Sequence, residues 1–396
     1  MLMDGGSGLK VFADMHIHVG RAGNDKPVKI TAARSLTVAN ILQEAAERKG
    51  IHMVGIVDAG SPAVQADIAA LCRQGELQTL AGGGLSYRRK LTLILGMEIE
   101  TTEQKGAGHC VVYLPSLAMM QGFTTSLQPY ITNLQLSTQK ARLCLAQVWD
   151  LAAQFAGIVM PAHIFTPYKS VYGSCCDSLQ ELLRPEQLAE LKAVELGLSS
   201  DTYLAELIGE LHGVSFLSNS DAHSLPKIGR EYNLLELPTI DFANFVRALT
   251  GENGCRILAN YGLDPKLGKY HRTFCEACNT VTQAPPPVTV CPECGSPHVV
   301  KGVLDRITEI TAPAVAVRPP YVHQVPLQFL PGLGPKTLAK LLDHFGTEMH
   351  VLHFAAEAEL VGVVGATLTR YIMASRLGNI SIATGGGGIY GKVIPE

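Results

Sequence analysis

The sequence lacks the features that would carry the protein into or across a membrane. No run of 18 apolar residues appears, and the first ten residues have no basic segment followed by an apolar one, as a signal peptide has. Only 17% of the residues are charged and 47% are hydrophobic, which argues against long disorder and allows a well-buried core. We therefore expect a cytoplasmic protein with one large domain and one or two small ones.

The ten cysteines lack the regular spacing of a disulfide framework. Four of them form two CxxC pairs. The other six lie mostly in apolar surroundings: Cys72, Cys110, Cys144, Cys175, Cys176 and Cys255. This pattern indicates reduced, buried thiols rather than secreted disulfides.

The chain also lacks a net basic charge, since its formal charge is −3. Alone, this charge is weak evidence against a nucleic-acid partner. However, residues 266–342 carry eight Lys and Arg against four Asp and Glu, which leaves about −7 on the remainder. This distribution fits a chain whose acidic N-terminal part binds cations and whose basic segment behind it binds phosphates.

Short apolar runs alternate with amphipathic stretches over the first 260 residues. Seven continuously apolar runs predict buried strands at 11–15, 54–58, 93–97, 110–114, 157–161, 193–196 and 214–218. They predict an α/β fold with a mostly parallel sheet or barrel covered by helices. Pro- and Gly-rich stretches then predict boundaries: a catalytic domain at 1–262, a small module at 263–315, and a helical domain at 316–396 with a flexible tail around 385–388.

Residues that bind metal ions stand at or near the ends of these predicted strands. They are His16, His18, Asp58, Glu98, Glu100, His109, His163, Glu195, Asp221 and His223. Because the carboxyl ends of parallel strands converge on one face, we expect these side chains to share a pocket. One His at a strand end is usually structural, but the set together predicts a multinuclear site for Zn²⁺, Mn²⁺ or Fe. Such a site suits phosphoester hydrolysis.

The stretches ADMHIH, GMEIE, PAHIFTP and SNSDAH, together with His109, resemble the motifs of the PHP (polymerase and histidinol phosphatase) superfamily. The resemblance implies a distorted (βα)7 barrel that holds two or three divalent metals, zinc first and Mn or Mg as alternatives. The ligands that it implies are His16, His18, Glu98, His109, His163, Asp221 and His223, with Glu98 as the bridge. Many members have a TDH tripeptide where this chain reads Val57-Asp58-Ala59. One metal is therefore expected to be weakly held or bound differently, with Asp58 and Asp25 as candidates to compensate.

Two CxxC pairs, Cys275/Cys278 and Cys291/Cys294, are separated by twelve residues. This spacing is typical of a four-thiolate structural zinc site, whereas a redox dithiol needs only one pair. Because so small a segment buries little core, zinc should supply most of its folding free energy. Such a module can serve as a rigid spacer or contact DNA, and the neighbouring Lys266, Lys269, His271 and Arg272 favour a phosphate contact.

Residues 329–342, FLPGLGPKTLAKLL, resemble a helix-hairpin-helix motif. Gly332 and Gly334 would expose backbone N–H groups to a DNA phosphate, and Lys336 and Lys340 would add ionic contacts. Residues 360–376 are a candidate second half. The alternative is a tight turn before an ordinary helix.

The three modules, in this order, resemble the endonuclease Q family over essentially the whole chain, and PAHIFTPYKSVYG, VELGLSSD, SNSDAHSLPKIGREY and ANYGLDPKLGKYHRTFC match as well. The resemblance implies a DNA repair endonuclease that cuts the phosphodiester 5′ to hypoxanthine, uracil, xanthine or an abasic site. The expected partner is single- or double-stranded DNA with such a lesion, bound by a monomer in the cytoplasm at the nucleoid. A replication or repair partner is left open.

Catalytic roles follow from the same comparison. Glu98 and Asp221 are expected to act through the metals. Lys169, Lys227 or Arg230, which adjoin the ligand loops, would neutralise charge on the phosphate, although a surface salt bridge suits each of them equally well. A damaged base would be extruded into a pocket built by the loops 163–173 and 195–201. Its candidate residues are Tyr168, Tyr172, Glu195 and Ser199, although core packing is slightly favoured for both tyrosines.

Three other functions remain open. A PHP small-molecule phosphatase would have little use for the zinc module and the hairpin. A PHP-type 3′–5′ exonuclease would need a free DNA end, so a closed circular substrate separates it from an endonuclease. A non-catalytic DNA-binding protein with a degenerate barrel should bind fewer than two ions in its N-terminal domain.

Overall fold

The computed structural model describes residues 8–312, 316–378, 380 and 382–394. All seven strands expected from the apolar runs are present: β1 (Leu9–Ile17), β2 (Met53–Ile56), β5 (Leu91–Thr102), β6 (Ala107–Leu114), β7 (Ile158–Pro161), β8 (Ala193–Glu195) and β9 (Ser215–Leu217). In the described part of the chain, no helix is both long and apolar enough to cross a membrane.

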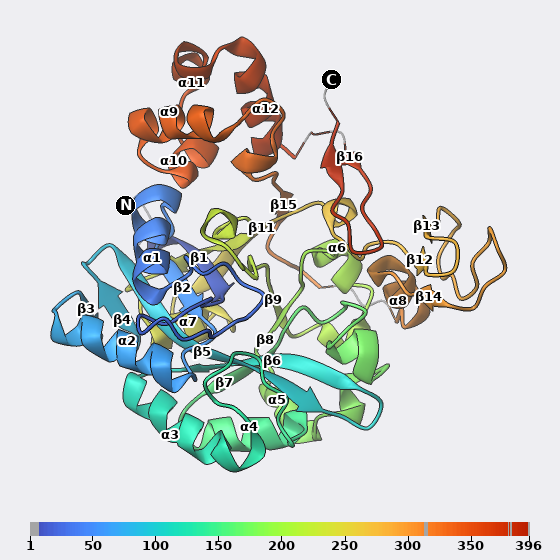
Figure 1. Cartoon of the computed structure of the whole chain (residues 1–396), viewed down its shortest axis with the longest axis horizontal. Helices are drawn as coiled ribbons and strands as arrows, with labels where there is room; N and C mark the ends of the chain where they lie inside the picture. The colour runs from blue at the N-terminus through green and yellow to red at the C-terminus, as the bar shows by residue number, and fades with distance from the viewer. Residues whose placement is uncertain (1–7, 313–315, 379, 381, 395–396) are drawn as a thin grey trace.

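These strands form a distorted α/β barrel (Figure 1). Strands β1, β2 and β5 pair in parallel, and β8 pairs in parallel with β9. The barrel continues from β7 to β8 where the Ile164 N–H donates to the Glu195 carbonyl over 3.0 Å. It continues from β9 to β1 where Ile17 forms a bridge with Ala222. Strand β5 is buried along almost its whole length, since both faces of the sheet are covered. This explains why apolar residues run without alternation.

The expectation of mostly parallel pairing is wrong for β6 and β7. Strand β6 is antiparallel to both β5 and β7. The start of β6 therefore lies beside the end of β5, and His109 pairs in register with Glu100. A residue before a predicted strand thus reaches the same pocket as residues that follow strands.

The sheet extends beyond the barrel on both sides. Strands β10 (Tyr232–Leu237), β11 (Arg256–Gly262) and β15 (Tyr321–His323) continue it from β1, and β3 (Leu77–Thr79) and β4 (Leu85–Tyr87) continue it from β5. The outer layer includes α1 (Val38–Gln43), α2 (Pro62–Arg73), α3 (Leu117–Leu127), α4 (Leu145–Ala153) and α7 (Phe242–Ala248). Strand β15 pairs with β11 although it follows the cysteine-bearing module in sequence. A three-residue strand gives too short an apolar run to be found in the sequence.

The cysteine-bearing module is a small sheet of β12 (Phe274–Cys275), β13 (Thr280–Val281) and β14 (Val299–Val300), followed by α8 (Val303–Glu309). Arg306 on α8 fastens it to the barrel by donating to the carbonyls of Tyr172 over 2.7 Å and Cys176 over 2.9 Å. The expected boundary at residue 315 lies outside the described residues.

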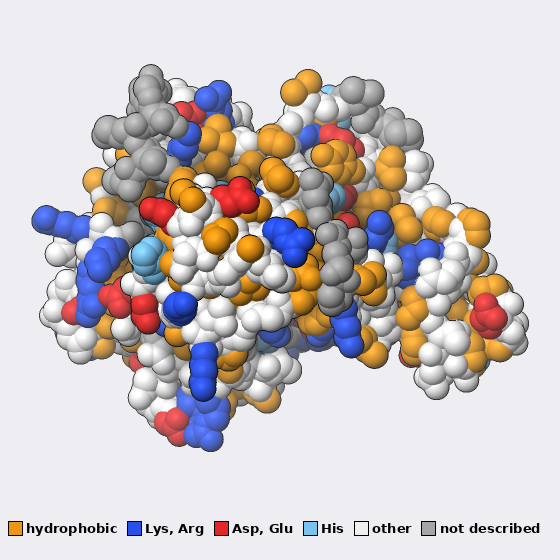
Figure 2. All heavy atoms as spheres, turned by 90° about the horizontal axis from the view of Figure 1, so that it is seen from above, with side chains coloured by type: hydrophobic (Ala, Val, Ile, Leu, Met, Phe, Trp, Pro, Cys, Tyr) orange, Lys and Arg blue, Asp and Glu red, His pale blue; other side chains and the backbone are white. Residues whose placement is uncertain are grey.

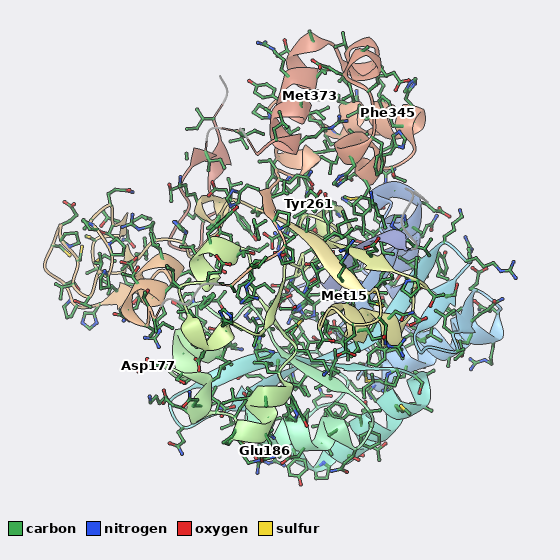
Figure 3. All side chains as sticks on the ribbon, turned by 180° about the vertical axis from the view of Figure 1, so that it is seen from behind. Met15, Asp177, Glu186, Tyr261, Phe345 and Met373 are labelled. Atoms are coloured by element: carbon green, nitrogen blue, oxygen red, sulfur yellow. The ribbon has the colours of Figure 1, made fainter. Side chains whose placement is uncertain are left out.

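Four helices, α9 (Pro335–Phe345), α10 (Glu348–His353), α11 (Glu357–Val364) and α12 (Ala366–Arg376), form a helical domain against the barrel. The rings of Tyr261 on β11 and His353 on α10 meet edge to face at 4.9 Å between centroids. A buried ion pair of 2.8 Å joins Lys49 to Glu348. Figure 3 shows Tyr261 between the barrel and the helices that carry Phe345 and Met373.

The glycine-rich segment that we expected to be a flexible tail forms a hairpin of β16 (Ile382–Ala383) and β17 (Lys392–Val393). The Gly385 N–H donates to the Lys266 carbonyl over 2.6 Å. Glycine permits the close approach here, since a Cβ on Gly387 would lie 2.5 Å from the Phe274 ring. The last two residues of the chain, 395 and 396, lie outside the described residues.

Candidate metal centre and its cavity

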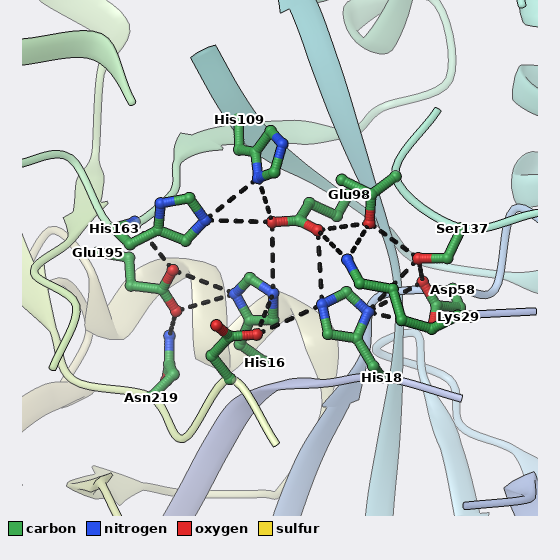
Figure 4. A network of polar contacts seen from close by, with 12 residues as sticks. His16, His18, Lys29, Asp58, Glu98, His109, Ser137, His163, Glu195 and Asn219 are labelled. Atoms are coloured by element: carbon green, nitrogen blue, oxygen red, sulfur yellow. Dashed lines mark hydrogen bonds and ion pairs between the residues drawn. The ribbon is translucent and has the colours of Figure 1, made fainter. Parts of the chain in front are cut away.

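Two groups of metal-capable side chains meet at one end of the barrel (Figure 4). One contains His16, His18 and Asp221, and the other contains Glu98, His109 and His163; within each group the ligand atoms lie within 4.8 Å of one another. These residues come from β1, β5, β6 and the loops after β7 and β9. Strand order therefore gathers six residues that are spread over more than 200 positions.

The Glu98 carboxylate lies between the two groups. Its Oε1 is 3.0 Å from His109 Nδ1 and 3.3 Å from His163 Nε2, and its Oε2 is 3.4 Å from His18 Nε2. Although burial opposes its charge, the neighbouring His109 and other cationic groups hold the pKa of Glu98 well below 4.5. A single ionised carboxylate therefore faces both groups, as a bridging ligand does.

The donor atoms fit divalent cations. The Nε2 atoms of His16 and His18 are buried and have no hydrogen-bond partner within the described structure. Both face the Asp221 carboxylate, at 3.7 Å and 3.4 Å respectively. Buried, unpartnered imidazole nitrogens beside carboxylates suit Zn²⁺ or Mn²⁺, because these ions take mixed nitrogen and oxygen ligands.

Two carboxylates expected to have other roles hold these imidazoles in place. Asp58 was predicted to be a ligand, but it accepts from His18 Nδ1 at 3.1 Å and from the Val19 N–H at 2.6 Å. Glu195, a predicted pocket residue, accepts from His16 Nδ1 at 3.0 Å and from Asn219 at 2.9 Å. Each fixes the tautomer that leaves Nε2 free for a metal. The ligand assignment of Asp58 is therefore corrected to a supporting role, whereas Glu195 both supports His16 and lines the cavity beside the centre, as predicted.

Lys29 is the residue that sequence reasoning missed. Its ammonium lies 3.3 Å from Glu98 Oε2 and 2.5 Å from Thr138 Oγ1, and Thr138 Oγ1 is 2.6 Å from the same Oε2. Only 16% of the Lys29 side chain is exposed. Asp25, which was a candidate to compensate for the missing TDH histidine, is instead paired with Arg21 on the surface at 2.7 Å. Lys29 lies in an irregular loop where no periodicity marks it.

Two of the six metal-capable residues have strained backbones. The φ angles of His163 and Asp221 are +31° and +44°, in the left-handed region that side chains with a Cβ rarely adopt. Gly197 makes room for the first, because a Cβ at that position would lie 2.8 Å from the His163 Cβ. Such strain concentrates at functional sites, where the surrounding structure holds it.

His223, a predicted ligand, lies beside the first group but is not part of it. Its Nδ1 donates to the Asp221 carbonyl over 3.0 Å, and its ring is 4.7 Å from that of His18. Burial lowers its pKa to about 4, so the imidazole is neutral at pH 7. His223 also lines the cavity that adjoins the centre.

This cavity has a volume of about 430 Å³ and opens on the metal centre. It is lined by Thr31, His163, Thr166, Tyr168, Glu195, Gly197, Leu198, Ser199, Asn219, Asp221, His223, Lys227, Arg230, Lys269, Tyr270 and Tyr390. Tyr168 and Ser199 therefore lie where a base pocket was predicted. Tyr172 does not, because its hydroxyl donates to Glu210 at 2.8 Å and its ring stacks on Phe165 in the core.

The predicted phosphate-binding cations are placed differently from one another. Arg230 lines the cavity and donates to the Ser220 carbonyl over 2.8 Å, while Lys227 lies nearby on the same wall. Lys169 is not among the lining residues, and its ammonium is paired with Glu100 at 2.7 Å. Lys269, predicted to contact DNA, also lines the cavity.

The four predicted zinc ligands converge. Cys275 Sγ is 3.7 Å from Cys294 Sγ, and Cys278 Sγ is 3.6 Å from Cys291 Sγ. These distances match the edge of about 3.8 Å expected for a ZnS₄ tetrahedron and are far too long for disulfides. The backbone N–H of Cys294 lowers the pKa of the Cys291 thiol to about 6, which favours the thiolate that binds zinc.

Arg272 and His271, next to this module, are not available to DNA. The Arg272 guanidinium donates to the Ala284 carbonyl and lies 3.9 Å from the buried Asp305 carboxylate. His271 is also buried. The predicted DNA contact of Arg272 is therefore corrected, since a buried carboxylate requires a nearby cation.

Comparison with known proteins places this geometry in a family. A family model described as PHP-associated matches residues 204–252. An endonuclease Q crystallised with a 27-mer duplex substrate, with an abasic lesion at its active site, is 30% identical; the match covers 98% of this chain and 97% of that one, with a TM-score of 0.83. The chain belongs to the endonuclease Q family.

A second endonuclease Q structure and two uncharacterised proteins are also similar to this chain. The lesion-specific endonuclease PfuEndoQ from Pyrococcus furiosus has a TM-score of 0.82 and 29% identity, over 97% of this chain and 95% of that one. YqxK of Bacillus subtilis, an uncharacterised protein, is 45% identical over 98% of this chain and all of its own length. MJ0043 of Methanocaldococcus jannaschii, also uncharacterised, is 37% identical, but the match covers 58% of this chain and 31% of that protein. The match to both endonuclease Q structures thus extends over at least 97% of this chain.

The hairpin predicted in this endonuclease Q protein begins helix α9. Gly332 has a φ of +80° and Gly334 caps the helix, while Lys336 and Lys340 are exposed on it. The predicted second half corresponds to α11 and α12, which meet at Gly365 with a φ of +81°. On the face shown in Figure 2, Lys and Arg are scattered among other side chains rather than gathered in one patch.

Proposed function

We propose that the protein is a DNA repair endonuclease that hydrolyses the phosphodiester 5′ to a deaminated base or an abasic site. The observation that carries this proposal is the two-group metal centre opening into a cavity of about 430 Å³. That volume lies within the range of small-ligand pockets, so an extruded nucleotide can reach the centre. Relatives described as lesion-specific, and as bound to an abasic duplex, support the same reaction.

We assign two divalent ions to the barrel, zinc first among the candidates, one in each three-residue group. Ions there would polarise the phosphoryl oxygen and lower the pKa of a water molecule. Through its two carboxylate oxygens, Glu98 contacts a histidine of each group. Arg230, whose guanidinium lines the cavity, would neutralise charge on the phosphate.

Lys29 supplies the positive charge that a third ion would bring. Its ammonium binds Glu98 Oε2 on the side away from His109 and His163. It thus balances the buried carboxylates where the histidine of a TDH tripeptide is missing. The DNA repair activity is proposed to need two ions and one ammonium.

The hairpin would hold the DNA beside this cavity. Gln328, just before the hairpin, donates to the Pro226 carbonyl over 3.1 Å, and Pro226 adjoins Lys227 of the cavity wall. The exposed N-terminus of α9 and its lysines would bind phosphates without reading sequence. A duplex on α9 would therefore pass close to the cavity mouth.

The activity is tested with end-labelled duplex DNA that carries one deoxyuridine, one deoxyinosine or one abasic site. We expect one cut immediately 5′ of each lesion, no cut in undamaged DNA, and loss of cleavage in His163→Ala. The matched control, His212→Ala, changes an exposed histidine outside the site and should cleave normally. A ladder that starts at the ends, or no cleavage of a closed circular lesion substrate, would favour an exonuclease instead.

The metal count is tested by elemental analysis of the purified protein. We expect three ions per chain in the wild type, two in the barrel and one in the four-cysteine site. Lys29→Met should keep three ions but lower cleavage about 10- to 100-fold, because losing a group that supports a metal ligand typically has about this effect. Lys26→Met, an exposed neighbour, is the control. Four ions in the wild type would show that Lys29 does not replace an ion.

A further inference from the structure

The wall of the cavity includes a residue from the far C-terminus. Tyr390, in the turn between β16 and β17, lines the cavity together with Tyr168 and Tyr270. The Tyr168 and Tyr270 rings meet edge to face at 6.0 Å between centroids. Aromatic side chains from three separate segments thus surround the space next to the metal centre.

Cationic groups hold Tyr390 in position. Its hydroxyl accepts a hydrogen bond from Arg230 Nη1 at 3.0 Å, and Lys269 Nζ lies 4.7 Å from its ring centroid. Arg230 Nη2 is in turn 3.4 Å from the carbonyl of Asp221, a member of the metal-capable group. The ring is therefore tied to the loop that follows β9 and leads into the centre.

The hairpin itself is fastened by backbone hydrogen bonds. The Gly388 N–H donates to the Lys269 carbonyl over 3.1 Å, and the Gly391 N–H donates to the Leu267 carbonyl over 3.0 Å. A Cβ on Gly391 would lie 2.5 Å from the Ala383 carbonyl oxygen, so the glycine allows this close approach. The two bonds flank Tyr390 and fix the course of its backbone beside the cavity.

We propose that Tyr390 is a specificity-determining residue, whose ring contacts the extruded base of a damaged nucleotide. The inference rests on the proposed endonuclease function and assigns a part of its pocket. A tyrosine ring offers any base a flat surface, and stacking of this kind is insensitive to which base is present. An abasic nucleotide has no base to stack, so its cleavage should not depend on the ring. Tyr390 would thus favour lesions that keep a base.

The test compares cleavage of a deoxyuridine duplex with cleavage of an abasic duplex of the same sequence. Tyr390→Ala should lower kcat/KM on deoxyuridine by roughly 5- to 150-fold, which is the range expected for one lost stacking contact. Cleavage of the abasic duplex should change by less than about 3-fold by the same reasoning. Tyr390→Phe keeps the ring and should preserve the ratio between the two substrates. Ile389→Ala, at an exposed neighbouring position, is the control.

Equal losses on both substrates would overturn the proposal, because Tyr390 would then act through Arg230 on every substrate. Unchanged cleavage of deoxyuridine by Tyr390→Ala would overturn it as well. Thermal unfolding of each variant shows whether the hairpin change disturbs the fold. If the wild type cleaves neither duplex, the proposed function itself fails, and this outcome is distinct from the other two.

Discussion

Replacing Glu98 with Gln should reduce lesion-dependent cleavage by about 10²- to 10³-fold, a loss typical of removing a key electrostatic group. The substitution keeps the size of the side chain but removes the charge that faces both metal-capable groups. Its oxygens lie 3.0 Å from His109 Nδ1 and 3.4 Å from His18 Nε2, so neither group keeps a full set of ligands. We also expect the barrel to lose at least one of its two ions.

Cleavage rates on a deoxyuridine duplex and elemental analysis of the same preparation check this prediction. Glu103→Gln is the matched control, because Glu103 follows the same strand but accepts from the Leu145 N–H at 2.8 Å, away from the centre. The control should cleave DNA and bind metal as the wild type does. A Glu98→Gln protein with three ions and normal rates would show that Glu98 does not bridge the groups.

The sequence predicted the residues of the centre better than their roles. His16, His18, Glu98, His109, His163 and Asp221 stand at strand ends, where topology brings distant residues together. Asp58 and Glu195 share this placement, yet they bind the Nδ1 atoms of His18 and His16. Ligands and their supports use the same residue types at the same strand ends. Only the distances between atoms in the structure distinguish a metal ligand from a residue that supports one.

Residues in irregular segments could not be predicted in this way. Lys29 reaches Glu98 from a loop, and Tyr390 reaches the cavity from a glycine-rich hairpin that looks like a tail in the sequence. Neither segment has a hydrophobic period that would show where its side chains point. The predicted DNA contact of Arg272 was wrong for a different reason. Its basic cluster suggested an exposed surface, but Arg272 lies beside the buried Asp305, 33 positions later in the sequence.

The same hairpin links the four-cysteine module to the cavity. Gly386 forms a bridge with Arg272, and Gly387 packs so closely on the Phe274 ring that no Cβ would fit. Phe274 belongs to β12, which continues into Cys275. Zinc bound by the four cysteines would thus stabilise the strand on which the hairpin rests, and through it the position of Tyr390.

Cys291→Ser combined with Cys294→Ser should therefore remove one zinc ion per chain and also impair cleavage. Because the module has little core of its own, we expect it to unfold locally and become sensitive to proteases between β12 and β14. The displaced hairpin would carry Tyr390 away, so deoxyuridine cleavage should fall more than abasic cleavage. Elemental analysis, limited proteolysis and the two-substrate assay measure the three effects.

Cys72→Ser combined with Cys144→Ser is the control, because both cysteines are partly buried and lie outside the module. It should keep all three ions and the wild-type ratio of the two cleavage rates. If the Cys291/Cys294 variant loses zinc but keeps that ratio, the hairpin holds its place without the module. Its position would then depend on the backbone bonds to residues 266–269 alone, and the metal in the module would serve only the fold around it.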